Sequence, residues 1–468
     1  MTPYPYALVG RKVTNGESMI YWAPLLHFYQ PPTQLHWVLR KVCDESYRPL
    51  VELFRDLPYA KVTVNITAVL AEMLYDHGFN DVIQGLRELA KRGQVEFTGS
   101  GKYHPILPLI PQEEMRRQIT QNTKTNRRFF GQAYSPKGFF PPEMCYGEEI
   151  VKPILDTGHQ WVIVSGVACP VEWPMNVIHE ISLGGERLVV FFRDDILSNK
   201  ISFQNIDAGG FIGHLRELRG EGADDVYVIT AMDAETFGHH IQDWEKLFLA
   251  EVYETLEPDE ADGAETAEGP QLAMVSPRGP TQARALAQQH GGLFQAREMA
   301  ESREVQAVTI SGLLDIFPRG LAVEPKASSW STSNDDIEAG NPYPLWKNKD
   351  NAIHQFQWEH LEIAMAMVNK AIKEAKSDAT KHYAHIARAL LDAALHSCQF
   401  WWASRRPMWD INLIDKGLEQ QREVILNAYK AISMSDCGDE DKKEYYYRVV
   451  AARDLRNKIV DKIFMTPG

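Results

Sequence analysis

Two acidic motifs place carboxylates directly after strongly apolar runs of the chain. Glu143 follows the sequence GFFPP, and Asp233 and Glu235 follow the β-branched run at residues 226–230. Each acid is therefore expected where a buried parallel strand meets the loop after it, which is where barrel enzymes hold their catalytic groups. A solvated surface loop is the alternative for any single glutamate, and the apolar residues before Glu143 argue against it.

Carboxylates at the ends of two strands are suited to the cleavage of a glycosidic bond. A retaining glycosidase uses one carboxylate as nucleophile and a second as general acid and base, with the two groups about 5–5.5 Å apart. Asp233 and Glu235 share one face of an extended segment, so one can donate the proton while the other orients it. From their spacing, both are candidates for the proton donor.

Five stretches of the sequence follow one another in the order of a known family. They are HFYQPP (27–32), GQVEFTGSGKYHPILPLIP (93–111), GFFPPEM (138–144), MDAETFGHH (232–240), and the Trp-containing SSWST with NPYPLWKNKDN (328–332 and 341–351). With them, most of the chain resembles glycoside hydrolase family 57, the retaining α-glucan enzymes that include amylases, 4-α-glucanotransferases and branching enzymes. The resemblance implies that Glu143 is the nucleophile, Asp233 the acid/base and Glu235 a supporting acid, and the mechanism that it implies requires no metal ion and no cofactor.

The first stretch departs from the pattern of that family. Many members read His-x-His-Gln-Pro, and here Tyr29 stands in place of the second His. Tyrosine can still hydrogen-bond a sugar hydroxyl and presents an apolar ring, so we expect a site with a shifted preference among sugar subsites.

Further residues in or near these stretches are candidates for substrate binding. Arg193 with Asp194 would clamp sugar hydroxyls through charge-assisted hydrogen bonds, or would form a structural salt bridge instead. For His104 a structural hydrogen bond is an equal alternative. Trp330 and Trp346 occupy a Ser-, Asn- and Pro-rich connection and are the preferred stacking platforms for sugar rings. The full set is His27, Gln30, Glu96, His104, Arg193, Asp194, His239, Trp330, Trp346 and Trp402.

Strand-like and helix-like segments alternate over the first two thirds of the chain. This rhythm predicts an α/β fold, an incomplete TIM-like (β/α)7 barrel at residues 1–320, with an exposed acidic insert near 257–271. A Trp-containing connection is predicted at 321–350. Period-3.6 patterns after it predict a C-terminal α-helical bundle at 351–468 that completes the substrate cleft.

Composition narrows the classes of partner. The 468 residues carry a net charge of −14, which disfavours nucleic acid and anionic membranes and leaves a neutral α-glucan or malto-oligosaccharide unaffected. The five cysteines show no CxxC spacing, and no apolar leader follows a basic stretch, so reduced thiols and a cytoplasmic location are expected. The oligomeric state is left open.

Two other functions fit part of the pattern. A metal-dependent carbohydrate deacetylase or α-mannosidase on a related barrel would draw ligands from Asp233, His239, His240, His27 and His104. An inactive glucan-binding protein would be expected to lack a catalytic carboxylate, whereas Glu143 and Asp233 are both present. For a retaining glycosidase, water as acceptor would give hydrolysis, and a sugar hydroxyl as acceptor would give glucan transfer.

Overall fold

The computed structural model describes residues 18–173, 175–219, 224–257 and 304–465. Its strands form two five-stranded sheets, one in the order β3-β2-β1-β8 with β9 also paired to β1, the other in the order β10-β6-β7-β5-β4. The strands are β1 (Ile20–Phe28), β2 (Val62–Ile66), β3 (Val95–Phe97), β4 (Gly138–Phe139), β5 (Trp161–Val164), β6 (Ile178–Leu183), β7 (Glu186–Phe192), β8 (Val226–Asp233), β9 (Val305–Ala307) and β10 (Arg319–Ala322).

The two sheets together outline an open barrel. Strand β3 meets β4 through one parallel bridge, Gly99 to Phe139, and β7 meets β8 through one bond from the Asp194 N–H to the Ile229 carbonyl at 2.8 Å. Strands β1, β2, β3, β4, β5, β7 and β8 thus line up around the barrel without continuous ladders at these two junctions. The predicted incomplete (β/α)7 barrel followed by a helical bundle is confirmed.

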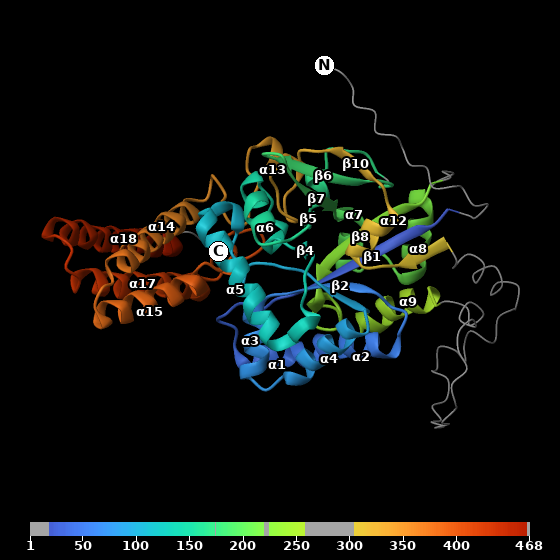
Figure 1. The fold of residues 1–468 in the computed structure, drawn as a ribbon, viewed down its shortest axis with the longest axis horizontal. Helices are drawn as coiled ribbons and strands as arrows, with labels where there is room; N and C mark the ends of the chain where they lie inside the picture. Colours follow the sequence, from blue (N-terminus) through green and yellow to red (C-terminus); the bar gives the residue numbers. More distant parts are fainter. Residues whose placement is uncertain (1–17, 174, 220–223, 258–303, 466–468) are drawn as a thin grey trace, which may run out of the picture.

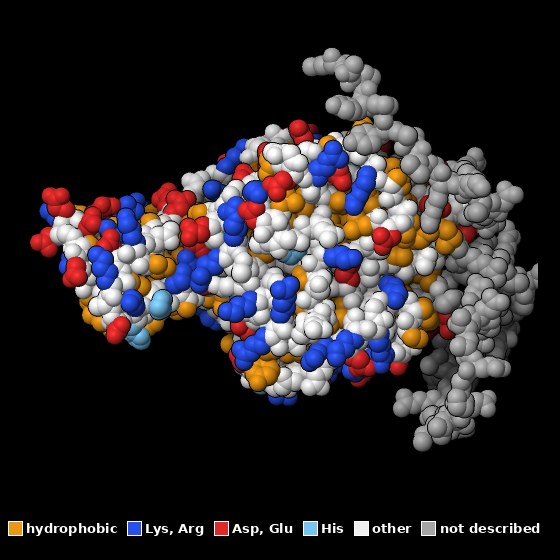
Figure 2. Space-filling view, viewed as in Figure 1, with side chains coloured by type: hydrophobic (Ala, Val, Ile, Leu, Met, Phe, Trp, Pro, Cys, Tyr) orange, Lys and Arg blue, Asp and Glu red, His pale blue; other side chains and the backbone are white. Residues whose placement is uncertain are grey.

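Helices surround the barrel and form a projecting bundle (Figure 1). Helices α14, α15, α17 and α18 pack on one another, and their outer surface mixes acidic and basic side chains (Figure 2). The helices are α1 (His36–Val42), α2 (Arg48–Asp56), α3 (Ala68–Asp76), α4 (Asn80–Lys91), α5 (Gln112–Phe130), α6 (Val151–Asp156), α7 (Asp195–Ser202), α8 (Ala208–Arg219), α9 (Glu251–Thr255), α12 (Leu313–Ile316), α13 (Asn334–Glu338), α14 (Ala352–Glu374), α15 (Asp378–Ala394), α16 (Cys398–Trp401), α17 (Ile411–Ser433) and α18 (Asp439–Met465).

Side chains on the strands alternate between two cores. On β1, Trp22 and Leu26 pack outward against the helices, whereas Ala23 and Leu25 belong to the other core inside the barrel. Because successive side chains of a strand point to opposite faces, His27 faces inward with Ala23 and Leu25. The inner core is continuous with the apolar faces of α14, α15, α17 and α18, so barrel and bundle share one core.

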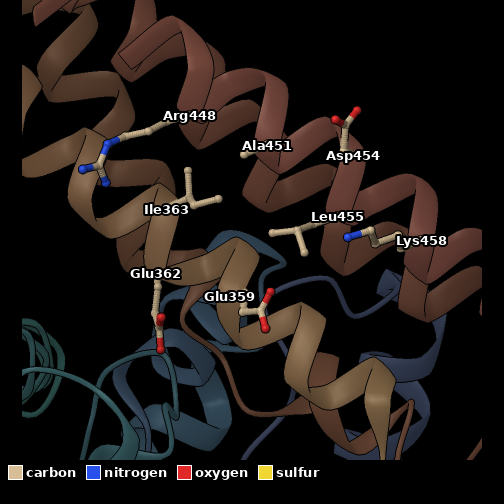
Figure 3. Close-up of a pocket in the computed structure, with 8 residues that line it drawn as sticks. All are labelled: Glu359, Glu362, Ile363, Arg448, Ala451, Asp454, Leu455 and Lys458. Atoms are coloured by element: carbon tan, nitrogen blue, oxygen red, sulfur yellow. The ribbon is translucent and has the colours of Figure 1, made fainter. Parts of the chain in front are cut away.

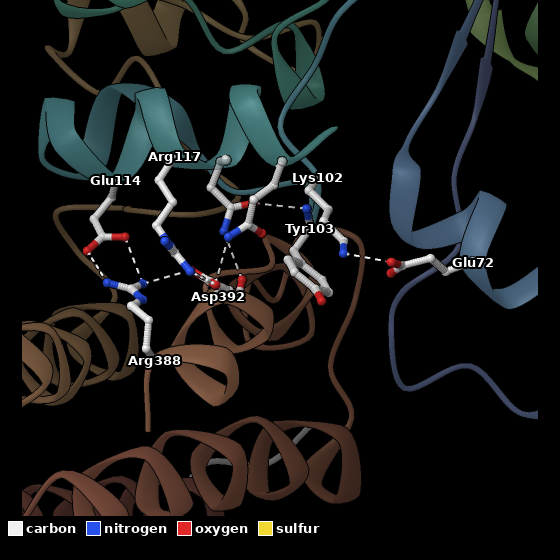
Figure 4. Close-up of polar contacts among 9 residues, drawn as sticks. Glu72, Lys102, Tyr103, Glu114, Arg117, Arg388 and Asp392 are labelled. Carbon is white, nitrogen blue, oxygen red and sulfur yellow. Dashed lines mark hydrogen bonds and ion pairs between the residues drawn. The ribbon is translucent and has the colours of Figure 1, made fainter. Parts of the chain in front are cut away.

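Charged side chains also join the barrel to the bundle, between α5 and α15 (Figure 4). Arg388 donates to both carboxylate oxygens of Glu114 at 2.6 and 2.8 Å. Arg117 donates to both oxygens of Asp392 at 2.7 and 2.6 Å, and Arg388 adds a third bond to Asp392 at 2.9 Å. Since Asp392 is only 6% exposed, it is a buried charge held by two guanidinium groups.

The apolar run AVTISGLLDIF at 307–317 would be expected to form a strand from its sequence, and only its first residue belongs to one. Strand β9 ends at Ala307, and a 3-10 turn (Ile310–Gly312) and α12 follow. The chain turns into the barrel there because the Ile310 N–H donates to the Thr63 hydroxyl at 3.0 Å and the Ser311 N–H donates to Glu96 at 3.0 Å. Residues 258–271 of the predicted acidic insert lie outside the described residues. No helix in the described ranges has the length and apolar character of a membrane span.

Candidate active site

Four inward side chains form one layer at the carboxyl ends of the strands. Strand pairing sets His27 beside Asn65 on one side and beside Asp233 on the other. Val64 pairs with Phe97, so Asn65 stands level with Thr98. The alternation of each strand turns these residues toward the barrel interior. The sequence prediction that Asp233 ends a buried strand is confirmed.

Glu143 enters this layer from the turn after β4. Its φ is 58° and that of Met144 is 48°, so two consecutive residues adopt the left-handed region that side chains disfavour. Oε2 of Glu143 accepts a hydrogen bond of 2.9 Å from Nε1 of Trp330. Burial and the nearby charge of Asp233 raise the pKa of Glu143 to about 8, opposed by hydrogen bonds from Trp330 and Ser397.

Two histidines continue from Glu143 into the barrel wall. His104 Nε2 lies 3.1 Å from His27 Nε2, and His27 Nδ1 lies 2.7 Å from Oδ1 of Asn65. Burial lowers the pKa of His27 to about 4 and that of His104 well below its usual value, so both rings are neutral at physiological pH. The ring of Tyr29 stacks on His104 with centroids 3.9 Å apart. The tyrosine that replaces the second His of the family pattern therefore packs against this pair.

Asp233 lies near the positively charged guanidinium of Arg193. Burial raises the pKa of Asp233 to about 6, and the charge of Arg193 opposes that rise. Arg193 donates to the Ala231 carbonyl at 2.8 Å and to Asp195 Oδ1 at 2.7 Å. Its guanidinium also lies 5.9 Å from the ring centroid of Trp330. The side chain is 4% exposed, so Arg193 is a built-in charge of the site.

Glu235 is buried and held by two donors. Its Oε1 accepts from Nε2 of Gln30 at 2.8 Å and from the hydroxyl of Tyr47. Burial and the charge of Asp233 raise the pKa of Glu235 to about 8, and these two bonds oppose the rise. Gln34 donates in turn to Gln30 at 2.7 Å. Two donors therefore hold the Glu235 carboxyl in a fixed position.

A π-helical turn (Cys43–Tyr47) grips the loop that carries Asp233 and Glu235. The Ser46 hydroxyl donates to the Ala234 carbonyl at 2.9 Å, and Glu45 Oε2 lies 2.6 Å from Nδ1 of His239. A Cβ at Gly238 would lie 1.8 Å from the Glu45 carbonyl, and its φ is 100°, so only glycine fits this approach. His239 thus pairs with protein rather than standing free in the layer.

Glu96 and Asp194 are held by structural contacts. Glu96 lies level with Thr63, one inward position below Thr98, and both of its oxygens bond Ser311. The Asp194 carboxylate caps α7 by accepting from the Leu197 N–H at 2.8 Å. Arg193 pairs with Asp195, so the alternative expectation, a salt bridge between Arg193 and Asp194, is not met among the described contacts. The clamp on sugar hydroxyls stays a prediction.

Two of the tryptophans expected to stack on sugars are buried. Trp346 is 1% exposed and packs in the inner core, where its carbonyl accepts from Trp358. Trp402 is 5% exposed and packs with Ile414 and Leu418. Trp346 is buried because the connection folds against α14, and Trp402, which follows α16, is buried against α17. Contact of either ring with a sugar stays a prediction. Trp330 is partly buried and bonds Glu143 instead.

A surface groove of about 590 Å³ lies between α14 and α18 (Figure 3). Charged residues such as Glu359 and Arg448 rim its apolar floor of Ile363 and Leu455, and none of the predicted site residues lines it. In the described ranges, no three His, Cys, Asp or Glu side chains are grouped to hold a metal ion. The donor set that a deacetylase or mannosidase reading needs is therefore not assembled there.

Three residues of the site escaped the sequence prediction. Asn65 was not among the candidate site residues, although the alternation of KVTVNIT turns it inward with Thr63. Tyr47 belongs to a helical pattern that gives no sign of a π turn. Ser397 precedes the WW pair of the bundle, and nothing local to it indicates contact with the barrel.

Solved structures share this fold. The 4-α-glucanotransferase of Thermococcus litoralis superposes with a TM-score of 0.62 at 21% identity, over 88% of this chain and 60% of that one. The GH57-type branching enzyme of Pyrococcus horikoshii gives 0.63 at 15% identity, over 95% of each chain. At these identities the likeness concerns the fold.

Sequence comparison is more specific. An α-amylase of Pyrococcus abyssi is 30% identical over 248 residues, 50% of this chain and 36% of that protein. A 4-α-glucanotransferase of Thermococcus litoralis is 30% identical over 266 residues, 54% of this chain and 38% of that protein. The matched part therefore spans little more than a third of these relatives. Residues 21–267, which include Glu143 and Asp233, match the profile of one family, and the chain belongs to glycosyl hydrolase family 57.

Proposed function

We propose that this protein is a retaining α-glucan-active enzyme in which Glu143 is the nucleophile, Asp233 the acid/base and Glu235 a supporting acid. The observation that carries the proposal is the electrostatic coupling of Glu143 with Asp233, two partly buried carboxyls from different strand ends. The names of the relatives, α-amylase and 4-α-glucanotransferase, support an α-glucan substrate. Residues 351–468 would complete the cleft, since Ser397 reaches His104 at 2.9 Å.

The first chemical step forms a glycosyl-enzyme. A carboxylate oxygen of Glu143 attacks the anomeric carbon, the bond from that carbon to the leaving oxygen breaks, and the proton of Asp233 passes to the leaving oxygen. In the second step the acceptor hydroxyl gives its proton to Asp233 and attacks the anomeric carbon. The ester bond breaks, Glu143 regains its charge, and two inversions give net retention.

The reacting state needs one proton on this pair of carboxyls, and that proton must lie on Asp233. In the free site the pKa values of about 8 for Glu143 and about 6 for Asp233 favour the opposite placement. Singly protonated molecules with the proton on Asp233 are therefore the minority form in the free site. Groups that stabilise ionised Glu143 therefore raise the reactive fraction directly.

The acceptor decides between hydrolysis and glucan transfer. Incubation of the purified protein with maltoheptaose would give only shorter oligomers if water is the acceptor, and both longer and shorter ones if a sugar 4-hydroxyl is. The α-anomer should form first by ¹H NMR, because retention preserves the configuration. Glu143→Gln should abolish every product, and a variant as active as the parent would end the proposal.

Azide rescue separates the roles of the acids on a substrate with an activated leaving group. In Glu143→Ala, azide would attack directly and give the β-glycosyl azide. In Asp233→Ala the glycosyl-enzyme still forms, and azide would release it as the α-glycosyl azide. If Glu235→Ala gives the α-azide and Asp233→Ala gives none, the acid/base role belongs to Glu235.

A further inference from the structure

The hydrogen-bond donors to the Glu143 side chain come from outside the barrel strands. Trp330 of the connection donates to Oε2 at 2.9 Å. The Ser397 hydroxyl, from the turn between α15 and α16, lies 2.9 Å from Nδ1 of His104, which is itself 3.6 Å from Oε1 of Glu143, and hydrogen bonding by this hydroxyl lowers the pKa of Glu143. Ser397 is fully buried, with an exposed fraction of 0%. The carboxyl therefore relies on two residues that follow the barrel in sequence.

His104 is near Glu143 but has no proton to give it. Asn65 Oδ1 can only accept, so Nδ1 of His27 carries the proton of that bond. Nε2 of neutral His27 must then accept, and Nε2 of His104 donates to it. Nδ1 of neutral His104 is left as an acceptor, although it lies 3.6 Å from Oε1 of Glu143.

The Asn65 amide is oriented by its other contacts. Its Nδ2 donates to the Thr98 hydroxyl at 2.8 Å and faces the Gly99 carbonyl at 3.4 Å, which can only accept. The proton order from His104 through His27 to Asn65 is thus fixed from the barrel wall. Ser397 Oγ lies 2.9 Å from the accepting Nδ1 of His104. Its single proton therefore faces two acceptors, His104 and Glu143.

We propose that Ser397 is a positioning residue for the nucleophile, with a hydroxyl proton that turns from His104 to Glu143 when Glu143 is ionised. The inference rests on the proposed function for its catalytic meaning. When Glu143 is protonated it needs no donor from Ser397, and the Ser397 hydroxyl donates to Nδ1 of His104. When Glu143 is ionised the Ser397 hydroxyl donates to it instead, because a hydrogen bond to a charged acceptor is about twice as strong as a neutral one.

Contacts on both sides hold Ser397 at this point. Its backbone N–H donates to the His104 carbonyl at 3.0 Å. Gln118 of α5 accepts from the Tyr103 N–H at 3.0 Å and donates to the Asp392 carbonyl at 2.9 Å. One glutamine thus ties the residue before His104 to the end of α15, five residues before Ser397. Docking of the bundle sets the distance between Ser397 and Glu143.

The charged and titratable groups that act on Glu143 come from several elements. They are Asp233 at the end of β8, His104 after β3, Tyr29 after β1, Cys145 in its own turn and Cys398 beside Ser397. Ser397→Ala keeps all of these side chains and removes only the hydroxyl, with its contacts to His104 and Cys398. A shift in the titration of Glu143 in that variant would therefore report the lost hydroxyl.

The test measures the Glu143 titration without activity. ¹³C-carboxyl NMR of the Glu-labelled full chain would follow Glu143, assigned by loss of its resonance in Glu143→Gln. Ser397→Ala should raise the Glu143 pKa by about 1 unit, since a hydrogen bond to a charged group is lost. Ser397→Thr keeps the hydroxyl and should restore the parent value. An unchanged titration in Ser397→Ala would overturn the inference.

Activity provides the second readout. In Ser397→Ala the alkaline limb of kcat/KM should move up by about 1 pH unit, and the neutral value should fall about tenfold as the reactive proton placement becomes rarer. A fall in kcat/KM with an unmoved limb would mean a merely structural role and would also overturn the inference. If Ser397→Ala fails to fold, Ser397→Cys takes its place. Because a thiol is a weak donor, the Glu143 pKa and the alkaline limb should then rise by a smaller amount.

Ser404→Ala is the matched control. Ser404 is also buried in the bundle, and its hydroxyl serves the Arg406 N–H and the Met408 carbonyl. It should leave both the Glu143 titration and the pH profile as in the parent. If the parent protein is inactive on glucans and the Glu143 pKa still rises in Ser397→Ala, the proposed function is contradicted and the hydrogen bond from Ser397 to Glu143 is supported.

Discussion

Trp330 bonds Glu143 twice. Its indole N–H donates to Oε2 at 2.9 Å, and its backbone N–H donates to the Glu143 carbonyl at 3.2 Å. The two bonds fix the main chain and the carboxylate of a residue whose φ of 58° is disfavoured for side chains. The ring lies edge-on to His27, with centroids 5.8 Å apart. Trp330 thus holds the nucleophile candidate in place, and stacking of its ring on a sugar stays a prediction.

Trp330→Phe should lower activity by removing the indole donor. Ionised Glu143 loses a charge-assisted bond, so its pKa should rise by about 1 unit and kcat/KM at neutral pH should fall about tenfold. Steady-state kinetics across pH would measure both. Trp244→Phe is the control, because Trp244 is also buried and donates only to the Ile201 carbonyl at 3.1 Å. Equal losses in the two variants would contradict the prediction.

Glu143→Gln should lower turnover on the order of 10⁴-fold and leave the fold intact. It should also flatten the dependence of stability on pH. The folded pKa of about 8 exceeds the ordinary 4.5, so the folded state binds more protons and the free energy of unfolding falls as pH rises between these values. Thermal unfolding from pH 4.5 to 8 would show a smaller loss in the variant. A loss as steep as that of the parent would count against the buried carboxyl.

The pH profile of kcat/KM should be bell-shaped with limbs near 6 and 8. Below about 6 both Asp233 and Glu143 are protonated and no nucleophile is available. Above about 8 both are ionised and no acid remains. The limbs belong to the coupled carboxyls as a set, with Glu235 also titrating near 8. Activity that persists undiminished to pH 10 would refute this assignment.

Tyr47→Phe should loosen Glu235. The loss of one donor leaves Gln30 as the remaining side-chain donor described here, so the pKa of Glu235 should rise and the protein should lose about 1–3 kcal/mol of stability. The pH profile of kcat/KM should also change, because Glu235 titrates together with the other carboxyls of the site. Tyr253→Phe serves as control, since that fully buried hydroxyl donates to the Lys61 carbonyl at 2.6 Å. It should cost similar stability and leave the pH profile in place.

Asp392→Asn should weaken the union of barrel and bundle. It strips a buried partner from Arg388 and Arg117, which costs about 3–5 kcal/mol for a broken buried pair. Chemical denaturation would measure the change. Asp415→Asn removes a pair with Arg456 that is 50% exposed at the carboxylate, and it should cost about 0–1 kcal/mol. Similar costs for the two variants would mean that the junction contributes little.

Apolar and β-branched runs predicted the strands that position the site. The run ending at Phe28 forms β1, and the run ending at Asp233 forms β8. Burial of these strands on both faces accounts for their near-continuous apolar character. The acids at their ends followed from the same pattern, and their roles remain proposals.

Contacts between distant segments were beyond the sequence pattern. Tyr47 and Ser397 reach the site through tertiary packing, 188 residues from Glu235 and 293 from His104. The burial of Trp346 and Trp402 was also not visible in the sequence, because one lies in a polar connection that folds against α14 and the other follows α16 and packs on α17. Strands β6 and β10 also went unpredicted, since an antiparallel addition interrupts the expected βα rhythm.

The apolar core that barrel and bundle share limits how this chain can be recombined. An exchange of the helical part with that of a relative, at a boundary near residue 350, would separate Trp330 from Ser397 and mismatch the residues packed between α14 and the barrel. Functional chimeras would have to inherit both donors together with the α5 surface that seats α15. The barrel and the bundle are thus expected to co-evolve.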